Sequence, residues 1–333
     1  MENVLISVCV PTFNYGRFLA NCIRSVQAQS HRNWELIITD DRSDDGSEAI
    51  CRQFEQDDVR IHYHRNPRRF GVYGNLARAV GLAQGSFVKI LCSDDWLHPD
   101  CLAKCLTLAS SRPNIALVCT NCVDTDIEGR PLWSNYVLPR AFMTSHQVLF
   151  REALGYRCVG GNSSYFLPRH LYQQVGGYDT DLRYVGDYLL ALKLCSAGDF
   201  VHTNEPLFYG RRHESQSSVQ DPKSFVDVSE TFIMVERFHR FAADQKLGRP
   251  SLVHTLAALA RIRLRAHLLV VLVFHFLRGR TRRARGIFSA IPVSPAEWVL
   301  AFFFLPVSLV QAGAFRVAFY ARKRRLNATV IKY

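Results

Sequence analysis

Short apolar runs and amphipathic segments alternate along the first 120 residues of the chain. The apolar runs are typical of strands buried on both faces of a sheet, and they lie at residues 5–10, 34–39, 60–64, 87–92 and 115–120. Helices are predicted between them, at residues 17–29, 47–56, 73–84 and 99–110. This alternation predicts an α/β fold with a doubly wound, mostly parallel, Rossmann-like sheet.

Polar residues follow three of the predicted strands at the point where each strand ends. They are Pro11-Thr12-Phe13-Asn14 after the first strand, Asp40-Asp41 after the second and Ser93-Asp94-Asp95 after the fourth. In a doubly wound sheet, ligands bind outside the carboxyl ends of the strands. The sequence therefore predicts a polar, acidic binding site along this edge of the sheet.

Asp94 and Asp95 are adjacent carboxylates on the turn after a strand. Mg²⁺ and Mn²⁺ take one or two protein carboxylates and complete their shells with water and phosphate oxygens, so the pair favours a metal site. An Asp that caps the following helix is the alternative, and it accounts for one of the two residues. For Asp40 and Asp41 two interpretations also stay open. They accept hydrogen bonds from a base or ribose, or they cap the helix that begins near Ser47.

Two later segments carry candidate catalytic and phosphate-binding groups. Asp187 begins an otherwise apolar helical segment at 184–193. A carboxylate is ordinary at the start of a helix, but it is a candidate general base if it faces the metal site. The basic run Arg211-Arg212-His213 has the groups that bind phosphate oxygens or a metal, whereas a solvated loop is the alternative.

In this order, the motifs resemble glycosyltransferase family 2, whose members have the GT-A fold and invert the configuration at the anomeric carbon. The resemblance covers residues 6–218. Beyond the segments above, it is carried by Trp34-Glu35-Leu36-Ile37-Ile38, Asn75, Gly85, Gly160-Gly161-Asn162-Ser163-Ser164, Gly176-Gly177-Tyr178-Asp179 and Gly186-Asp187. The resemblance implies a GT-A type sheet and a transferase that takes a sugar from a nucleotide diphosphate donor, with UDP favoured by the habit of the family.

The resemblance also implies roles for individual residues. Contacts with the donor are implied for Pro11, Thr12, Phe13, Asn14, Asp40, Asp41, Asn75, Ser93, Asp94, Arg211, Arg212 and His213. Asp94, Asp95 and His213 would bind a divalent metal, Mn²⁺ or Mg²⁺, and Asp187 would deprotonate the acceptor hydroxyl. Contacts with the acceptor are implied for Trp96, Gly161 and Asn162.

Two positions depart from the family pattern. Cys92 replaces the first acid of the Asp-X-Asp motif, and Gly186 replaces the acid that often precedes the base. These departures keep a second hypothesis open, a relative that binds nucleotide sugars without catalysis. A dehydrogenase also has alternating strands and helices, but it needs Gly-X-Gly-X-X-Gly after its first strand. Only one glycine, Gly16, lies between Pro11 and Arg17.

The net charge of +12 is concentrated at the end of the chain. Residues 251–333 contain fourteen Lys or Arg and one acid, Glu297, so they carry +13 and leave −1 for the residues before them. Arginine clusters flank two apolar stretches, 266–277 and 298–315. The first stretch is shorter than the roughly 20 residues of a spanning helix, and the second contains Pro306. Such segments favour helices that lie in the interface of an anionic membrane.

We therefore expect a catalytic domain at 1–220 and, at 221–333, a helical appendage that associates with an anionic membrane surface through residues 257–333. A soluble helical appendage and a nucleic-acid-binding segment are the alternatives. The arginines alternate with aliphatic runs rather than with stacking aromatic residues, so no nucleic acid is expected as a partner.

Membrane attachment also bears on the acceptor and on the location. It implies a glycan or polyprenyl-diphosphate-linked acceptor in surface polysaccharide synthesis. The first residues show no basic region followed by an apolar one, so no signal peptide is visible. We expect the chain on the cytoplasmic side of the inner (plasma) membrane, peripheral or shallowly inserted.

Ten cysteines lie between Cys9 and Cys195, mostly in the apolar runs. Free cysteine behaves there as a small buried hydrophobe, and a disulfide framework is unexpected in a chain of this size without a secretion signal. The pairs Cys101/Cys105 and Cys119/Cys122 have a spacing that zinc tolerates, but Cys119 lies in a predicted core strand. Buried thiols are the favoured interpretation.

Overall fold

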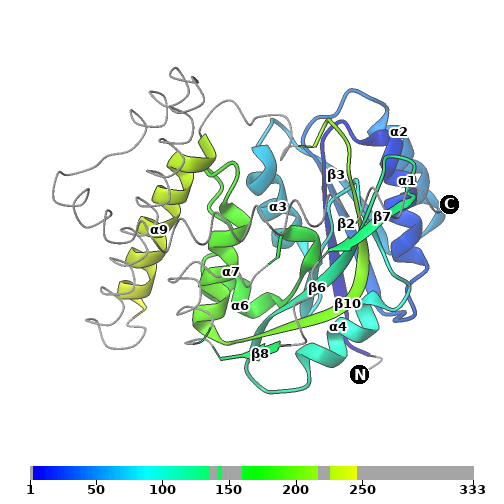
Figure 1. Ribbon diagram of the computed structural model, residues 1–333. Coiled ribbons are helices and arrows are strands. Elements are labelled where there is room, and N and C mark those ends of the chain that lie inside the picture. The colour runs from blue at the N-terminus through cyan, green and yellow to red at the C-terminus, as the bar shows by residue number, and fades with distance from the viewer. Residues whose placement is uncertain (1–2, 136–140, 145–146, 148–159, 217–225, 246–333) are drawn as a thin grey trace, which may run out of the picture.

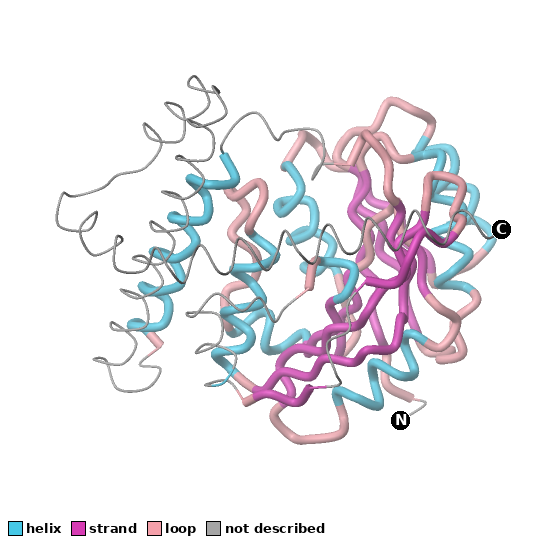
Figure 2. Tube along the Cα trace, in the orientation of Figure 1, coloured by secondary structure: helices cyan, strands magenta, loops and turns pink. Residues whose placement is uncertain are grey.

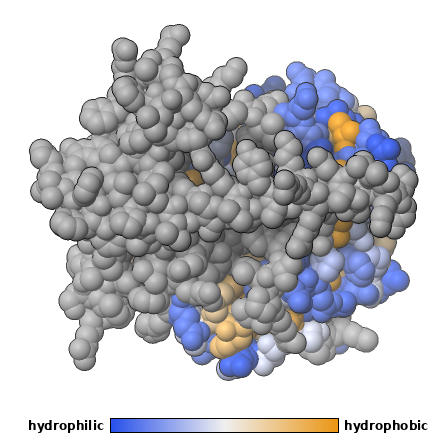
Figure 3. Space-filling view, in the orientation of Figure 1, coloured by the Kyte–Doolittle hydropathy of each residue, from blue (hydrophilic) through white to orange (hydrophobic). Residues whose placement is uncertain are grey.

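The computed structural model describes residues 3–135, 141–144, 147, 160–216 and 226–245 (Figure 1). The basic tail lies outside the described residues, and so do both of its apolar stretches, 266–277 and 298–315. In the part of the chain that the structure describes, no helix is long and apolar enough to cross a membrane. The described surface is mainly hydrophilic in the view of Figure 3.

Ten strands of the described chain form one sheet, in the order β3-β2-β1-β4-β9-β6-β10-β5, with β7 beside β6 and β8 beside β10 (Figures 1 and 2). The strands are β1 (Ile6–Thr12), β2 (Trp34–Asp40), β3 (Ile61–Arg65), β4 (Phe87–Ile90), β5 (Trp96–Leu97), β6 (Ile115–Thr125), β7 (Pro131–Asn135), β8 (Ala141–Met143), β9 (Tyr165–Pro168) and β10 (Asp199–Arg211). Neighbours within the group β3-β2-β1-β4 are parallel, as the sequence predicts.

The other half of the sheet is mixed, so the predicted mostly parallel sheet is wrong there. β9 runs antiparallel to both of its neighbours, β4 and β6. The chain enters β9 from the edge at which β4 ends, since Lys89 pairs with Phe166 and Phe87 with Pro168. The turn before β9 therefore lies at the carboxyl edge of the sheet, beside the acidic residues that follow β4.

Helices cover both faces of the sheet (Figure 1). One face carries α1 (Gly16–Gln27), α2 (Ser47–Asp57) and α4 (Cys101–Ala109), and the other carries α3 (Gly71–Leu82), α6 (Arg169–Gln174) and α7 (Gly186–Ala197), with α9 (Val226–Asp244) packed on α7. Ile6, Val8 and Val10 of β1 face the first core, and Cys9 faces the second. Because side chains alternate across a strand, a strand with a core on each side is mostly apolar on both faces.

The predicted elements agree with the structure except near their ends. The strand predicted at 115–120 continues to Thr125, and the helix predicted at 17–29 ends at Gln27. Gln29 lies beyond that helix, and its side chain donates to His98 O at 2.8 Å and accepts from Leu102 N at 3.0 Å. This buried amide ties the end of α1 to the start of α4.

Three of the four cysteines weighed as a zinc site are buried thiols, and Cys122 is half-buried. Cys101, Cys105 and Cys119 are fully buried in the two apolar cores, which confirms the favoured interpretation. Burial raises the pKa of the Cys119 thiol to about 11. A different group in the described chain has donor atoms close enough to share one ion, and it consists of Cys92 with Asp94 and Asp95.

A buried polar cluster holds the turn that leads into β4. Ser7 donates its hydroxyl to the Glu35 carboxylate at 2.6 Å, and the N–H groups of Gln84 and Gly85 donate to the same oxygen at 2.7 and 3.1 Å. A Cβ atom at Gly85 would lie 2.7 Å from Ser7 N, so only glycine permits this close approach. The cluster fixes the start of β4 and thereby the acidic turn at its end.

Candidate active site

Asn75 joins the ends of β1 and β2. Its buried side chain donates to the carbonyl groups of Thr12 and Thr39 at 3.3 and 2.9 Å, and it accepts a hydrogen bond from Asn66 at 2.9 Å. The N–H of Asp41 donates to Thr12 O at 2.9 Å. The ends of β1 and β2 therefore meet. The sequence predicts that both lie at the edge of the sheet that binds the donor, which we call the donor edge.

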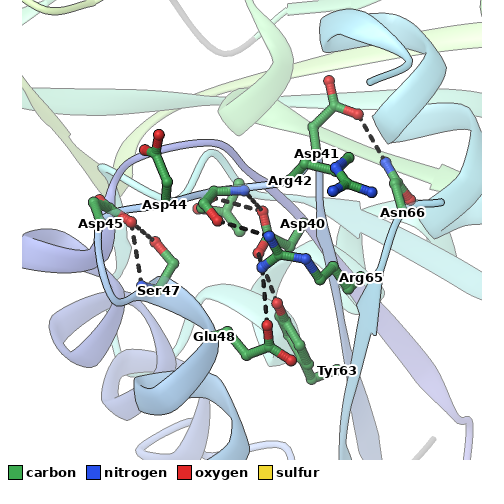
Figure 4. A network of polar contacts seen from close by, with 12 residues as sticks. Asp40, Asp41, Arg42, Asp44, Asp45, Ser47, Glu48, Tyr63, Arg65 and Asn66 are labelled. Carbon is green, nitrogen blue, oxygen red and sulfur yellow. Dashed lines mark hydrogen bonds and ion pairs between the residues drawn. The ribbon is translucent and has the colours of Figure 1, made fainter. Parts of the chain in front are cut away.

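Asp41 holds the segment that precedes α3. Its carboxylate accepts hydrogen bonds from the N–H groups of Phe70 and Gly71 at 2.7 and 2.9 Å, and from Asn66 at 2.9 Å (Figure 4). A carboxylate at this end of a helix is favourable because the first N–H groups have no partner within the helix. Asp41 thus caps α3 rather than the helix that begins at Ser47.

Asp40 is 0 % exposed and is bound by the protein itself. One of its oxygens accepts from the N–H and hydroxyl of Ser43 at 2.7 and 2.6 Å, and the other accepts from the Tyr63 hydroxyl at 2.6 Å (Figure 4). Arg65 lies 3.6 Å from the second oxygen. Asp40 therefore shapes the loop after β2, and a donor contact from this carboxylate would have to displace one of these partners.

The loop after β1 is tied to the loop after β2. Asn14 has a left-handed φ of 55°, its N–H donates to Ser43 Oγ at 2.9 Å, and its side-chain oxygen accepts from Asp44 N at 2.9 Å. Phe13 is half-buried, and the Arg69 guanidinium lies over its ring at 3.7 Å. The ring expected to contact the nucleoside thus has a cationic neighbour that the sequence analysis did not single out.

Asp94, Asp95 and Cys92 form the acidic turn after β4. The N–H of Asp95 donates to Cys92 O at 3.0 Å, and a carboxylate oxygen of each Asp and the Cys92 Sγ all lie within 4.8 Å of one another. Both carboxylates are buried, as is Ser93 between Cys92 and Asp94. These residues come from one short segment, so their proximity follows from the turn alone.

The end of β10 brings its own groups to this turn, from more than a hundred residues away. His213 Nε2 lies 3.1 Å from Asp94 Oδ2, and His213 Nδ1 lies 2.7 Å from Ser215 Oγ. The N–H of Arg211 donates to Asp95 Oδ1 at 3.0 Å, and its Nε donates to Asp94 O at 3.1 Å. The structure therefore brings together Asp94, Asp95 and His213, the three residues predicted to bind a metal.

The charges of this cluster favour a cation. Burial and the neighbouring Asp94 carboxylate raise the pKa of Asp95 to about 8. Burial and both carboxylates also raise the pKa of the Cys92 thiol well above its usual value. Two carboxylates and an imidazole are ligands that divalent ions accept, and a bound ion offsets the repulsion of two buried carboxylates. The residues present thus fit a divalent metal.

Asp187 lies at the start of α7, on the other side of the turn that precedes β9. Tyr73 donates its hydroxyl to Asp187 Oδ1 at 3.2 Å, and the N–H of Tyr188 donates to the same oxygen at 2.7 Å. A Cβ atom at Gly161 would lie 3.6 Å from Asp187 Oδ2. The carboxylate is therefore held through Oδ1, while Oδ2 faces a residue without a side chain.

Gly186, one of the two departures from the family pattern, has a structural reason. A Cβ atom at this position would lie 2.6 Å from the ring of Tyr73. Any larger residue would push this ring away and break its hydrogen bond to Asp187. Glycine at 186 thus makes room for the tyrosine that orients the neighbouring carboxylate.

The 3₁₀ turn Asn162–Ser164 connects the acidic turn to Asp187. Ser163 Oγ accepts from Cys92 N at 2.9 Å, and Ser163 O accepts from the ammonium of the fully buried Lys89 at 2.5 Å. Asn162 Oδ1 accepts from Tyr178 at 2.7 Å. Gly161 and Asn162, both expected to contact the acceptor, therefore lie beside the candidate base. Neither Ser163 nor Tyr73 was predicted to take part in the site.

Trp96 lies beside Arg211, one of the two arginines at the end of β10. The Arg211 guanidinium lies 4.7 Å from the ring of Trp96 and 4.7 Å from that of Phe18, so the arginine is enclosed by aromatic rings. Arg212 is half-exposed and donates to Asp124 Oδ1 at 2.8 Å. Trp96, which is expected to contact the acceptor, thus lies against Arg211, one of the residues expected to contact the donor.

Glu230 of α9 holds the segment that delivers Asp187. Its carboxylate accepts from the N–H groups of Arg183 and Tyr184 at 2.7 and 2.6 Å, and from Val185 at 3.4 Å. Arg237, two turns further along α9, binds Asp179 and Asp181 of the same segment. α9 begins beyond the predicted domain boundary at residue 220, yet it packs on the helix that carries the candidate base.

Comparison with known proteins indicates a family for the first half of the chain. Residues 7–166 match the model described as "Glycosyl transferase family 2", and they contain the donor edge, the acidic turn and the turn before β9. These residues, 160 of the 333 in the chain, carry the likeness to glycosyltransferase family 2, and curated glycosyltransferases are among the relatives of the chain.

The matches to curated relatives cover only part of each protein. The chain is 25% identical over 216 residues to the chondroitin synthase of Escherichia coli, which is 65% of this chain and 30% of that protein. It is 34% identical over 119 residues to the GalNAc(5)-diNAcBac-PP-undecaprenol beta-1,3-glucosyltransferase of Campylobacter jejuni, which is 35% of this chain and 38% of that protein. The chain thus spans about a third of the length of these relatives.

Solved structures share the fold. TarS of S. aureus in complex with UDP-GlcNAc is similar with a TM-score of 0.63 and 14% identity, covering 86% of this chain and 81% of that one. The mannosyltransferase PcManGT of Pyrobaculum calidifontis in complex with GDP-Man and Mn²⁺ has a TM-score of 0.53 and 16% identity, covering 86% and 85%. At these identities the likeness shows a common GT-A-like fold.

The environment of Asp95 predicts a dependence of stability on pH. Aspartate in an unfolded chain has a pKa near 3.9, whereas burial and Asp94 raise the pKa of Asp95 to about 8 in the folded state. Between these values the folded state keeps a proton that the unfolded state releases. The free energy of unfolding contributed by Asp95 therefore falls as the pH rises from about 4 to about 8.

Thermal unfolding of the metal-free protein measures this effect. We expect the melting temperature of Asp95→Asn to fall less than that of the wild type as the pH rises over this range, because the variant lacks the titrating group. Asp57→Asn, at an exposed position of α2, is the matched control and should follow the wild type. Parallel pH profiles for Asp95→Asn and the wild type would contradict the environment assigned to Asp95.

Proposed function

We propose that this chain is an inverting glycosyltransferase that moves a sugar from a nucleotide diphosphate sugar to an acceptor hydroxyl. The observation that carries the proposal is the meeting of three groups at one edge of the sheet. These are the buried pair Asp94 and Asp95, His213 from the end of β10, and Asp187 across the Asn162–Ser164 turn. The likeness to folds solved with UDP-GlcNAc and with GDP-Man and Mn²⁺ supports the same function.

Asp94 and Asp95, with His213, would hold a divalent ion, Mn²⁺ or Mg²⁺. When bound, the ion supplies positive charge where negative charge builds up on the departing diphosphate. His213 is kept in place by Ser215, and the backbone of Arg211 keeps Asp95 in place. Donor contacts from the remaining predicted residues, Pro11 to Asn14 and Asp41 among them, are part of this proposal.

Asp187 would act as the general base. The acceptor oxygen attacks the anomeric carbon as the bond to the diphosphate breaks, and Asp187 takes the hydroxyl proton. Tyr73 and the N–H of Tyr188 hold Oδ1, and Oδ2 lies toward Gly161. Burial and the Asp187 charge raise the pKa of the Tyr73 hydroxyl, so Tyr73 stays a hydrogen-bond donor. A positioned base contributes about 10²–10⁴-fold to the rate.

The names of the relatives and similar structures support a nucleotide and a class of acceptor for this proposal. One similar structure contains UDP-GlcNAc, which favours UDP as the nucleotide. One relative builds a chondroitin chain and another acts on an undecaprenol-diphosphate-linked glycan, by their names. We therefore propose a glycan or polyprenyl-diphosphate-linked acceptor in surface polysaccharide synthesis.

The catalytic unit of this proposal extends through α9. Glu230 and Arg237 bind the segment before α7, so removing α9 would release the backbone that positions Asp187. The boundary with the basic tail then falls after Asp244 rather than at residue 220.

Replacing Asp187 tests the enzyme directly. We expect Asp187→Asn to lower the release of UDP from UDP-sugars, measured with Mn²⁺ and a panel of glycan acceptors, by about 10²–10⁴-fold. The affinity for the donor should stay the same, because the carboxylate serves the acceptor. Asp57→Asn is the control and should keep full turnover. A folded wild type that binds nucleotide and turns over no donor would favour a relative that binds sugars without catalysis.

The basic tail supports a proposal for where in the cell the chain acts. We propose that residues 257–333 bind the anionic surface of the plasma membrane from the cytoplasmic side, where each basic residue contributes about 1 kcal/mol. We expect the full chain to sediment with phosphatidylglycerol vesicles and not with phosphatidylcholine vesicles. Replacing the five arginines between residues 278 and 285 with glutamine should weaken this binding.

Unchanged sedimentation of that variant would contradict the proposal for the tail. Tight, salt-sensitive binding of the full chain to duplex DNA without binding to vesicles would support the nucleic-acid alternative instead.

A further inference from the structure

Cys92 stands where the family pattern has an acid, and its thiol belongs to the acidic cluster. The Sγ atom lies within 4.8 Å of a carboxylate oxygen of Asp94 and of Asp95. The backbone of Cys92 is held on both sides, since its N–H donates to Ser163 Oγ at 2.9 Å and its carbonyl accepts from Asp95 N at 3.0 Å. These two bonds fix the backbone that places the thiol beside the two carboxylates.

Most other cysteines of the described chain have a different environment. Those that are fully buried in apolar packing are Cys9, Cys22, Cys51, Cys101, Cys105, Cys119 and Cys195. Cys92 is half-buried, and its surroundings are polar. Packing accounts for these buried thiols, of which Cys22 also donates to the Cys92 carbonyl at 3.9 Å, whereas it does not account for a thiol beside two carboxylates.

The spacing of the three donor atoms suits a single ion. A divalent metal binds oxygen and sulfur at about 2.0–2.5 Å, so donors that share one ion lie at most about twice that distance apart. The separations within this cluster, all below 4.8 Å, meet that limit. His213 Nε2, 3.1 Å from Asp94 Oδ2, adds a nitrogen donor next to the same carboxylate.

We propose that Cys92 supplies a sulfur ligand to the divalent ion held by Asp94 and Asp95, so that this site selects transition ions such as Mn²⁺, Zn²⁺ and Cd²⁺ over Mg²⁺. The inference rests on the metal site of the proposed function and adds to it the identity of one ligand. Thiolate and imidazole favour softer ions, whereas Mg²⁺ prefers a shell of oxygens. Zn²⁺ binds such ligands more tightly than Mn²⁺ does. We therefore expect Zn²⁺ to compete with Mn²⁺ at this site.

Cadmium binding detects the sulfur ligand without any turnover. A bond between sulfur and Cd²⁺ produces a charge-transfer band in the ultraviolet, and we expect the full chain to develop this band with one equivalent of Cd²⁺. Cys92→Ser should lose the band. Cys122→Ser removes the other half-buried cysteine of the described chain and should keep it. A band that survives in Cys92→Ser, or a folded wild type without a band, overturns the proposal.

Metal competition in the wild type and metal selectivity in a second variant provide another measurement. Mn²⁺ should displace Cd²⁺ from the wild type at a lower concentration than Mg²⁺ does. Cys92→Asp restores the acid of the family pattern, and it should lower the ratio of Mn²⁺ to Mg²⁺ affinity by about 10-fold or more, the usual scale for altered metal ligation. An unchanged ratio overturns the proposal.

Different results would contradict the proposed function and the sulfur ligand. A band that depends on Cys92 in a protein without sugar transfer would contradict the proposed function and leave the sulfur ligand in place. Metal-dependent transfer by a protein whose cadmium band survives in Cys92→Ser would support the function and overturn the sulfur ligand.

Discussion

The burial of two adjacent carboxylates at the end of β4 is the constraint on which the rest of the site depends. Burying such a pair is unfavourable unless hydrogen bonds or cations offset its charge. The compensation comes from the end of β10, where the Arg211 N–H binds Asp95 and His213 binds Asp94. These contacts require β10 and β4 to run in the same direction. Between β4 and β6, β9 runs antiparallel to both, so the turn before it, which carries Ser163, lies at the edge where β4 ends. The acidic turn, the mixed half of the sheet and the position of Asp187 are thus parts of one arrangement.

How far the sequence predicts this arrangement depends on the range of the contacts. The strands β1, β2 and β4 and the helices between them follow from apolar periodicity, because each has a core on the expected side. The mixed half does not, since the direction in which the four residues of β9 pair is set by partners far away in the chain. The metal residues were predicted from the paired acids and the basic run, and the resemblance assigned their roles. The contact of His213 with Asp94 confirms only that they meet. Tyr73 and Glu230 were missed because they act on Asp187 and its backbone across 114 and 46 residues, a range at which the sequence has no local signal.

The two departures from the family pattern have different meanings once the side chains are placed. From the sequence alone, each departure supports the hypothesis that the chain is a relative that has lost catalysis. In the structure, Gly186 makes room for Tyr73, which binds the candidate base, so the loss of one acid is matched by the gain of an orienting hydroxyl. Cys92 keeps a donor atom within reach of both carboxylates. Both changes alter how the site is built and are compatible with an active enzyme.

Metal-dependent binding of a nucleotide at Asp94 and Asp95 is the central claim, and calorimetry tests it most directly. UDP, GDP and dTDP would each be titrated into the full-length wild type and into Asp94→Asn, with and without Mn²⁺. We expect one nucleotide to bind the wild type in the presence of Mn²⁺ and to lose most of its affinity when either the metal or the Asp94 carboxylate is removed. Equal binding by the wild type and Asp94→Asn, or no binding of any nucleotide to the folded protein, would contradict the claim.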